Sequence, residues 1–199
     1  MFPSFKKGIS LLFLLFIAIL SFGQENKVKS KTSEDKYDKP SHWASVQVKN
    51  AKLINSERID FSPSYYQSGV VFVSSRKNWG ELDRAIDETF FDLYYSDLDE
   101  AGVPLPPTTF SRNLNSDLHE GPGCFNLSGD VFFFTRNNYQ QGQQKSDEHG
   151  YVGTKIYRAS KGDYDWDNIQ ELPFNSDSYS CQHPSLSSDV KRLYFSSNM

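Results

Sequence analysis

One short pattern recurs along the chain at a fixed interval of 60 residues. An Asn-Ser-acidic triplet occurs at Asn55–Glu57, Asn115–Asp117 and Asn175–Asp177. Each triplet is followed by a proline and then by a run of strand-forming residues. A period of this size with several short strands per unit is typical of repeat architectures. The repeat therefore constrains the fold more strongly than any single residue.

Each complete unit predicts four antiparallel strands. The expected strands lie near residues 60–65, 70–74, 91–96 and 108–112 in the first unit, near 123–127, 131–135, 155–159 and 168–172 in the second, and near 193–196 in the third. Tight turns are expected at Ser68-Gly69 and Ser128-Gly129, where glycine permits backbone conformations closed to most residues. The aromatic content of 15% also favours β-structure. Four antiparallel strands per repeat indicate an all-β fold built from β-propeller blades, with a two-halved β-sandwich as the alternative.

The repeat also predicts the boundaries of the units. We expect an outer strand without a blade of its own at 44–54, one blade at 55–114, a second at 115–174 and half a blade at 175–199. A propeller needs at least about four blades. We therefore expect about two and a half blades, an incomplete propeller in a truncated chain.

The first 43 residues predict targeting and tethering segments. Lys6 and Lys7 precede an apolar run of about 14 residues, which is shorter than the roughly 20 needed to span a bilayer. Small residues at Ser21–Gly23 favour cleavage of a signal peptide over residues 1–23. Residues 24–43 are polar and rich in lysine, as in a solvated tether. The sequence thus predicts an exported protein without a transmembrane helix once the leader is removed.

Net charge argues against one class of partner. The formal charge is −4, and loss of Lys6 and Lys7 with the leader makes it −6. An acidic chain of this kind is not expected to bind nucleic acid.

The third unit carries a family resemblance. Residues His183–Asn198, H-P-S-L-S-S-D-V-K-R-L-Y-F-S-S-N, resemble the TolB-type, WD-like propeller repeat, with Val190 in place of the usual glycine. The first and second units match more loosely, through Pro63, Gly69, Pro122 and Gly129. The order of leader, tether, V-K-N-A-K-L-I-N and blades is similar to the front of Bacteroidetes outer-membrane proteins of the OmpA family.

This resemblance implies a periplasmic, outer-membrane-associated protein whose propeller binds or scaffolds without catalysis. The implied partner is an envelope protein or a peptidoglycan-associated assembly. In that family a carboxypeptidase-regulatory-like domain and a peptidoglycan-binding domain follow the propeller. The alternative is the propeller domain of an exported serine peptidase or glycan-active enzyme.

Cysteines and histidines suggest little chemistry. Cys124 and Cys181 are expected on or near the first strands of adjacent blades, where either a disulfide or two free thiols is conceivable. The four histidines lack metal-ligand spacing, so we expect no metal and no cofactor. The sequence contains no G-x-S-x-G elbow and no Gly-rich phosphate loop, and we expect no catalytic residue.

Two long loops carry the candidate binding residues. They join the second and third strands of each blade and should emerge on the same rim as the turns between blades. Because arginine, tryptophan and tyrosine are favoured interface anchors, we predict that this rim is the binding face. The candidate residues are Arg76, Lys77, Trp79, Arg84, Arg136, Tyr139 and Tyr151.

Overall fold

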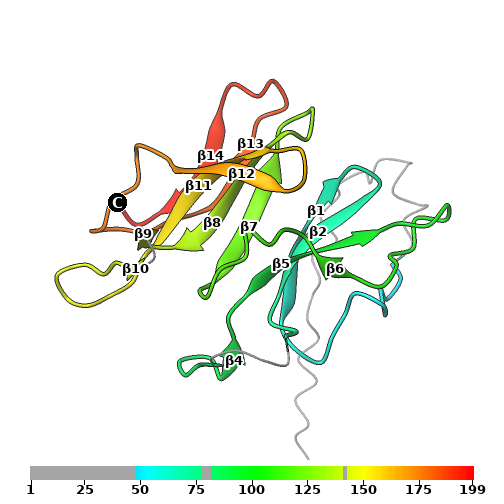
Figure 1. The fold of residues 1–199 in the computed structure, drawn as a ribbon, viewed down its shortest axis with the longest axis horizontal. Helices are drawn as coiled ribbons and strands as arrows, with labels where there is room; N and C mark the ends of the chain where they lie inside the picture. The colour runs from blue at the N-terminus through cyan, green and yellow to red at the C-terminus, as the bar shows by residue number, and fades with distance from the viewer. Residues whose placement is uncertain (1–47, 78–81, 141–142) are drawn as a thin grey trace, which may run out of the picture. The chain divides into compact units, whose positions relative to one another are not determined.

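The computed structural model describes residues 48–77, 82–140 and 143–199 (Figure 1). Within these residues every regular element is a strand, and the compact unit that carries all fourteen strands spans Lys49–Met199. The expected all-β class is confirmed.

The first sheet contains four antiparallel strands in the order β1-β2-β5-β6. They are β1 (Asp60–Tyr66), β2 (Gly69–Ser74), β5 (Asp92–Asp97) and β6 (Thr108–Thr109). A small hairpin of β3 (Leu82–Asp83) and β4 (Glu88–Thr89) lies in the connection between β2 and β5.

The second sheet repeats this arrangement in the order β7-β8-β11-β12. Its strands are β7 (Glu120–Phe125), β8 (Val131–Asn137), β11 (Thr154–Lys161) and β12 (Trp166–Glu171). The hairpin in its long connection is formed by β9 (Tyr139–Gln140) and β10 (Gln143–Gln144). The third unit contributes one hairpin, β13 (Cys181–Leu186) and β14 (Leu193–Ser197). About two and a half four-stranded units are therefore present, as predicted.

Two predicted strands differ from the structure. Residues 48–54, the described part of the expected outer strand, form a turn at 52–54 and no strand. The fourth strand of the first unit ends at Thr109 rather than near Arg112. The reason is that the amides of Arg112 and Asn113 donate to the Asp165 carboxylate, 3.1 and 3.3 Å away, instead of extending the sheet.

A bulge recurs in the first strand of every unit. The register shifts between Phe61 and Ser64, between Glu120 and Gly123, and between Gln182 and Ser185. The three prolines that follow the triplets, at positions 63, 122 and 184, all lie in these bulges. Because proline has no N–H to donate, it fits where the ladder is already interrupted.

Aromatic side chains fill the interface between the two sheets. The Tyr66 ring stacks on Phe125, with centroids 4.4 Å apart, and Phe125 stacks on Phe132 at the same distance. Phe110 and Trp166 extend the cluster, their centroids 5.7 Å apart. Burial of such large rings is the main source of stability at the junction.

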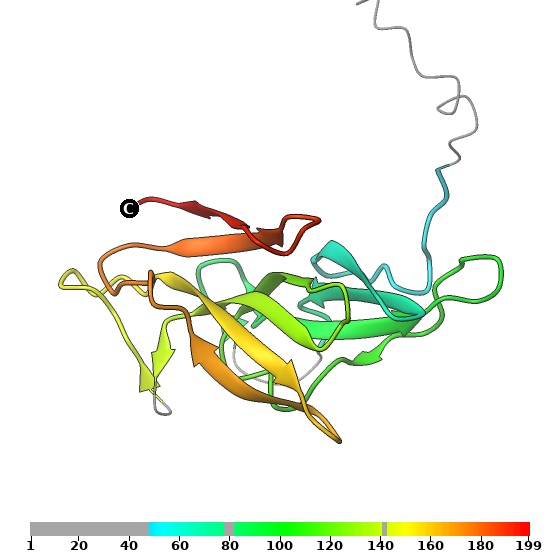
Figure 2. The ribbon, with the colours of Figure 1, turned by 90° about the horizontal axis from the view of Figure 1, so that it is seen from above.

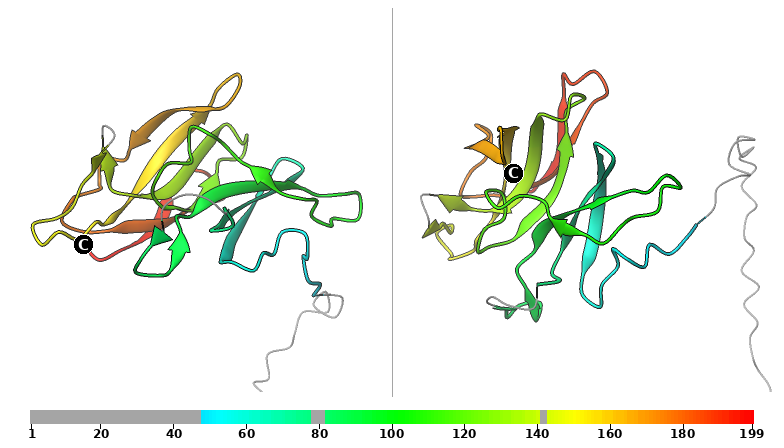
Figure 3. Two further views of the ribbon diagram at one scale, coloured as in Figure 1. Left: turned by 60° about the horizontal axis from the view of Figure 1, so that its bottom comes forward. Right: turned by 45° about the vertical axis from the view of Figure 1, so that its right-hand side comes forward.

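The β13–β14 hairpin lies along the other face of the second sheet (Figures 2 and 3). The amide of His183 in β13 donates to Thr135 Oγ1 of β8 over 3.0 Å. Phe132 and Phe134 point away from Thr135, because successive side chains of a strand alternate between its two faces. On that opposite face Phe132 contacts Phe110, which directly follows β6 of the first sheet, with centroids 5.8 Å apart. The second sheet is therefore covered on both faces.

The turn glycines have two different roles. Gly129 has φ +70°, as expected for a turn glycine. Gly69 does not have a positive φ; in that turn Gln67 has φ 51°. A Cβ on Gly69 would lie 2.2 Å from the Ser96 carbonyl oxygen, so glycine is required there for the close approach of two strands.

The third unit closes the corresponding turn without glycine. Val190 adopts φ 58°, and its amide donates to the Ser187 carbonyl at 2.9 Å. The replacement of the usual glycine therefore preserves the turn, but it places a β-branched residue in the left-handed region.

Candidate functional site at the loop rim

One edge of the sheets gathers the connections that the sequence singled out. We call it the loop rim: the β2–β5 and β8–β11 connections together with the turns that join one unit to the next. Asp83 of β3 contacts the inter-unit turn through His119, with Oδ2 and Nε2 2.9 Å apart. Asn138, directly after β8, donates to Asp177 over 2.8 Å. These contacts place the loops and the inter-unit turns together.

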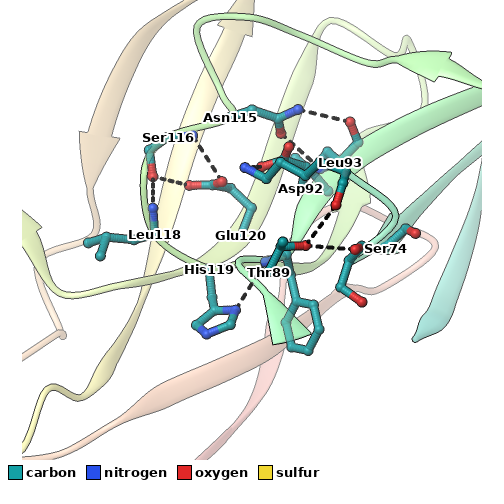
Figure 4. Close-up of polar contacts among 12 residues, drawn as sticks. Ser74, Thr89, Asp92, Leu93, Asn115, Ser116, Leu118, His119 and Glu120 are labelled. Carbon is teal, nitrogen blue, oxygen red and sulfur yellow. Dashed lines mark hydrogen bonds and ion pairs between the residues drawn. The ribbon is translucent and has the colours of Figure 1, made fainter. Parts of the chain in front are cut away.

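The asparagine of the triplet joins one unit to the preceding one (Figure 4). Asn115 Oδ1 accepts from the Leu93 amide at 2.8 Å, and its Nδ2 donates to the Leu93 carbonyl at 3.1 Å. Asn175 makes the same pair of bonds to Ile156, at 3.0 and 2.8 Å. Asn55 has no preceding unit among the described residues, and its side chain donates to Asn50.

The serine of the triplet organises the unit that follows. In the first unit, the Ser56 amide and hydroxyl donate to Asp60 over 2.6 and 2.7 Å. Arg76 Nη2 donates both to Asp60, at 2.6 Å, and to the Ile54 carbonyl. Burial favours a higher pKa for Asp60, but the hydrogen bonds from Ser74, Ser56 and Arg76 outweigh it and lower that pKa. We call this arrangement of serine, acid and arginine the clamp.

The second unit repeats the clamp in a fully buried setting. The Ser116 amide and hydroxyl donate to Glu120 over 3.0 and 2.6 Å (Figure 4). Arg136 Nε donates to Glu120 at 2.9 Å, while its Nη2 donates to the Leu114 carbonyl. Glu120 has no exposed surface, and burial raises its pKa to about 7 despite the opposing charge of Arg136.

The third unit has a cysteine in the place of the acid. Cys181 pairs with Ser197 at the start of β13, as Glu120 pairs with Arg136 at the start of β7. In the structure Cys124 and Cys181 are free thiols, which is the second of the two alternatives left by the sequence. Burial raises the pKa of Cys124 to about 11.

Three of the predicted binding residues are engaged inside the protein. The side chains of Arg76 and Arg136 form the two clamps, and Lys77 Nζ lies 2.8 Å from Asp92. The structure thus gives these three side chains a role within the chain, and contact with a partner stays a prediction for them. The sequence carried a signal of the structural role, because Arg76 and Arg136 are one repeat length apart and follow their acids by equal intervals.

The other predicted residues are placed differently. Arg84 is exposed in the β3–β4 hairpin, and Tyr151 is exposed in the β8–β11 connection. Trp79 lies outside the described residues. Tyr139 begins β9, but its side chain is outside the described part. Arg84 and Tyr151 are therefore the predicted residues best placed for contact with a partner.

The loop rim also contains a cavity that the sequence did not reveal. Its volume is about 450 Å³, and its lining includes Lys77, Asp92, Thr109, Arg112 and Asp117. Arg112 and Asp117 are exposed, whereas Asp92 is buried. Burial raises the pKa of Asp92, the bond from Lys77 opposes this, and the nearby charge of Asp117 adds to it. The cavity therefore presents charges of both signs.

A second cavity, of about 340 Å³, lies at the opposite ends of the strands. It is bordered by Tyr66, Phe110 and Trp166 of the aromatic core, by Lys161 at the end of β11 and by Tyr164 of the β11–β12 turn. Because three of these rings already pack in the core, this cavity is the outer mouth of the interface between the sheets.

Two other kinds of site are absent from the described residues. There, no group of three or more histidine, cysteine, aspartate or glutamate side chains is arranged to hold a metal ion. No helix in the same part of the chain has the length and apolarity needed to cross a membrane.

Comparisons with known proteins do not identify the chain. No model of a protein family, no curated protein and no solved structure matches it.

Proposed function

We propose that this chain is a non-catalytic binding or scaffold module of an exported, envelope-associated protein. The observation that carries the proposal is the division of charges on the loop rim. The partly buried Asp60 and the fully buried Glu120 bind the backbone of the triplets, whereas Arg84, Arg112 and Asp117 are exposed on the connections. Loops that display such groups on a rigid scaffold are the usual site of recognition.

The engaged carboxylates support a binding role over a catalytic one. Each accepts hydrogen bonds from a serine amide, a serine hydroxyl and an arginine. Those bonds occupy the lone pairs that a general base would need for a substrate proton. The clamps are therefore best explained as structural elements of a scaffold.

The location and partner are proposed from the sequence. The apolar leader supports export, and the resemblance to TolB-type repeats of OmpA-family proteins supports a periplasmic, outer-membrane-associated site. The proposed partner is an envelope protein or a peptidoglycan-associated assembly.

Co-sedimentation tests this proposal. The purified chain, without residues 1–23, is mixed with peptidoglycan sacculi or with outer-membrane vesicles and pelleted. We expect the wild-type chain to pellet with one of them and Arg84→Glu/Tyr151→Ala to remain in the supernatant. The matched control Arg192→Glu/Tyr164→Ala changes similarly exposed residues away from the loop rim and should pellet normally. Equal pelleting of all three chains, or of none, would contradict the proposal.

A further inference from the structure

The first junction, between the first and second units, and the second junction, between the second and third units, have the same backbone framework but contain different side chains. The triplet asparagines bind Leu93 and Ile156 in the same way, and Asp92 and Lys155 immediately precede these two residues. The strand pairing agrees. Asp92 pairs with Ser74, which in turn pairs with the clamp acid Asp60. Lys155 pairs with Arg136, which in turn pairs with the clamp acid Glu120. Asp92 and Lys155 therefore occupy equivalent places next to the two clamps.

Two further pairs of positions correspond. Thr109 pairs with Tyr94, and Glu171 pairs with Tyr157, each tyrosine being two residues beyond the Asp92 or Lys155 position. Asp117 and Asp177, the acidic residues of the second and third triplets, form the other pair. The set in the first junction, Asp92, Thr109 and Asp117, thus matches the set in the second, Lys155, Glu171 and Asp177.

An ammonium group occupies the second junction. Lys155 Nζ lies 2.6 Å from Asp177 and 2.8 Å from Glu171, and its side chain is only 2% exposed. Burial alone would lower the pKa of Lys155, but its bonds to the two carboxylates outweigh this and raise it. The second junction therefore forms a stable binding site for an ammonium group.

The first junction is open at the equivalent place. Aspartate and threonine are shorter than the lysine and glutamate that they replace, and Asp92, Thr109 and Asp117 line the 450 Å³ cavity. Lys77, which also lines the cavity, donates to Oδ1 of Asp92 over 2.8 Å. The exposed Asp117, whose counterpart binds Lys155, is part of the same lining.

We propose that this cavity binds a primary ammonium group on an unbranched alkyl chain. Asp92 and Asp117 would bind the ammonium group, as Glu171 and Asp177 bind that of Lys155 in the second junction. The inference rests on the proposed binding function and names the ligand chemistry of the same rim. Arg112, on the cavity wall, offers a second contact to a ligand that also bears a carboxylate.

Titration of the chain by NMR tests this inference. The probes are n-butylammonium, 6-aminohexanoate, the blocked peptide acetyl-Gly-Lys-Gly-amide and, as the uncharged control, n-butanol. We expect the ammonium probes to shift the amide signals of Asp92, Thr109 and Asp117, and n-butanol to leave them unchanged. Tighter binding of 6-aminohexanoate indicates a free amino acid as the source, and tighter binding of the peptide indicates a lysine side chain of a partner.

Two variants make the test specific. Asp117→Asn should weaken binding about tenfold, because it removes one charge-assisted hydrogen bond, whereas the control Asp163→Asn should not. Asp92→Lys/Thr109→Glu recreates the filled junction and should abolish binding. Binding that is unaffected by Asp117→Asn, or no binding of any ammonium probe, overturns the inference. If the chain still pellets with envelope material in that case, the proposed function stands without it.

Discussion

Asp60 and Glu120 occupy the same place in successive units, and each is bound by a serine four residues earlier and an arginine sixteen residues later. They differ in burial: the Asp60 side chain is 13% exposed, and that of Glu120 is fully buried. The result is opposite shifts in pKa, lower for Asp60 and higher for Glu120.

These shifts predict different effects of neutral substitutions. At pH 8, Asp60→Asn should lower the free energy of unfolding by about 1–2 kcal/mol, because it removes a charge that its hydrogen bonds favour. Glu120→Gln should stay within about 1 kcal/mol of the wild type, because burial disfavours the charge that it removes and the amide oxygen of glutamine can still accept the bonds from Ser116 and Arg136. Urea denaturation of both variants measures the difference. Equal losses in the two variants would show that the clamps are energetically alike.

The pKa of Glu120 also predicts the pH dependence of stability. A carboxyl group whose pKa rises from 4.5 to about 7 on folding binds its proton more tightly in the folded state. Its contribution is therefore greatest below pH 4.5 and falls as the pH rises to about 7, by about 3 kcal/mol at most. Unfolding free energies measured from about pH 5 to about pH 8 should fall more in the wild type than in Glu120→Gln. Parallel profiles would contradict this prediction.

The asparagine that joins the units should be more important at the second triplet than at the first. Asn115→Ala leaves the amide of Leu93 without its side-chain acceptor, which should cost about 1–3 kcal/mol. Asn55→Ala is the matched control, because the Asn55 side chain donates to the exposed Asn50, and its cost should be below about 0.5 kcal/mol. Thermal denaturation of the two variants compares them directly, and an equal loss at both positions would be evidence against the joining role.

Val190 should be a site where substitution increases stability. A β-branched residue at φ 58° is strained by about 1–2 kcal/mol. Glycine relieves this strain, but it also increases the conformational entropy of the unfolded chain, which offsets part of the gain in stability. Val190→Gly should therefore raise the free energy of unfolding by about 0.5–1 kcal/mol. Val103→Gly, at an exposed loop valine without a positive φ, should lower it. A decrease in both variants would show that the β13–β14 turn is not strained.

The two cysteines should be free thiols that react only slowly in the folded chain. Because the pKa of Cys124 is about 11, only about one part in a thousand is thiolate at pH 8. Cys181 is fully buried. Without any reductant, a thiol reagent should react slowly with the native chain and count two thiols after denaturation in urea. A count of zero after denaturation would establish a disulfide.

The sequence predicts the repeated framework because its signals are local. The triplets, the prolines and the apolar second strands each specify a turn, a bulge or a buried strand without reference to the other units. The roles of single side chains are harder to predict. Residue type alone places Arg76 and Arg136 among the binding residues, although their recurrence at one repeat length favours a structural role.

The cavity is not predictable from the 60-residue alignment. Asp92 and Lys155 are 63 residues apart, so alignment by the triplets, which recur every 60 residues, does not bring them together. Only the pairing of the strands shows that an aspartate stands where the other unit has a lysine. Side-chain chemistry at a junction depends on this register, which the triplets alone do not specify.

The two-way linkage made by the second triplet has an evolutionary consequence. Its asparagine binds the unit before it, and its serine binds the unit after it. A duplicated gene segment that begins at a triplet would carry its own connection to the existing unit and would offer the next copy an identical strand to bind. Units of this kind can be added one after another by simple duplication. The side chains of each new junction are then free to diverge, either filling the space between the units or leaving a cavity there.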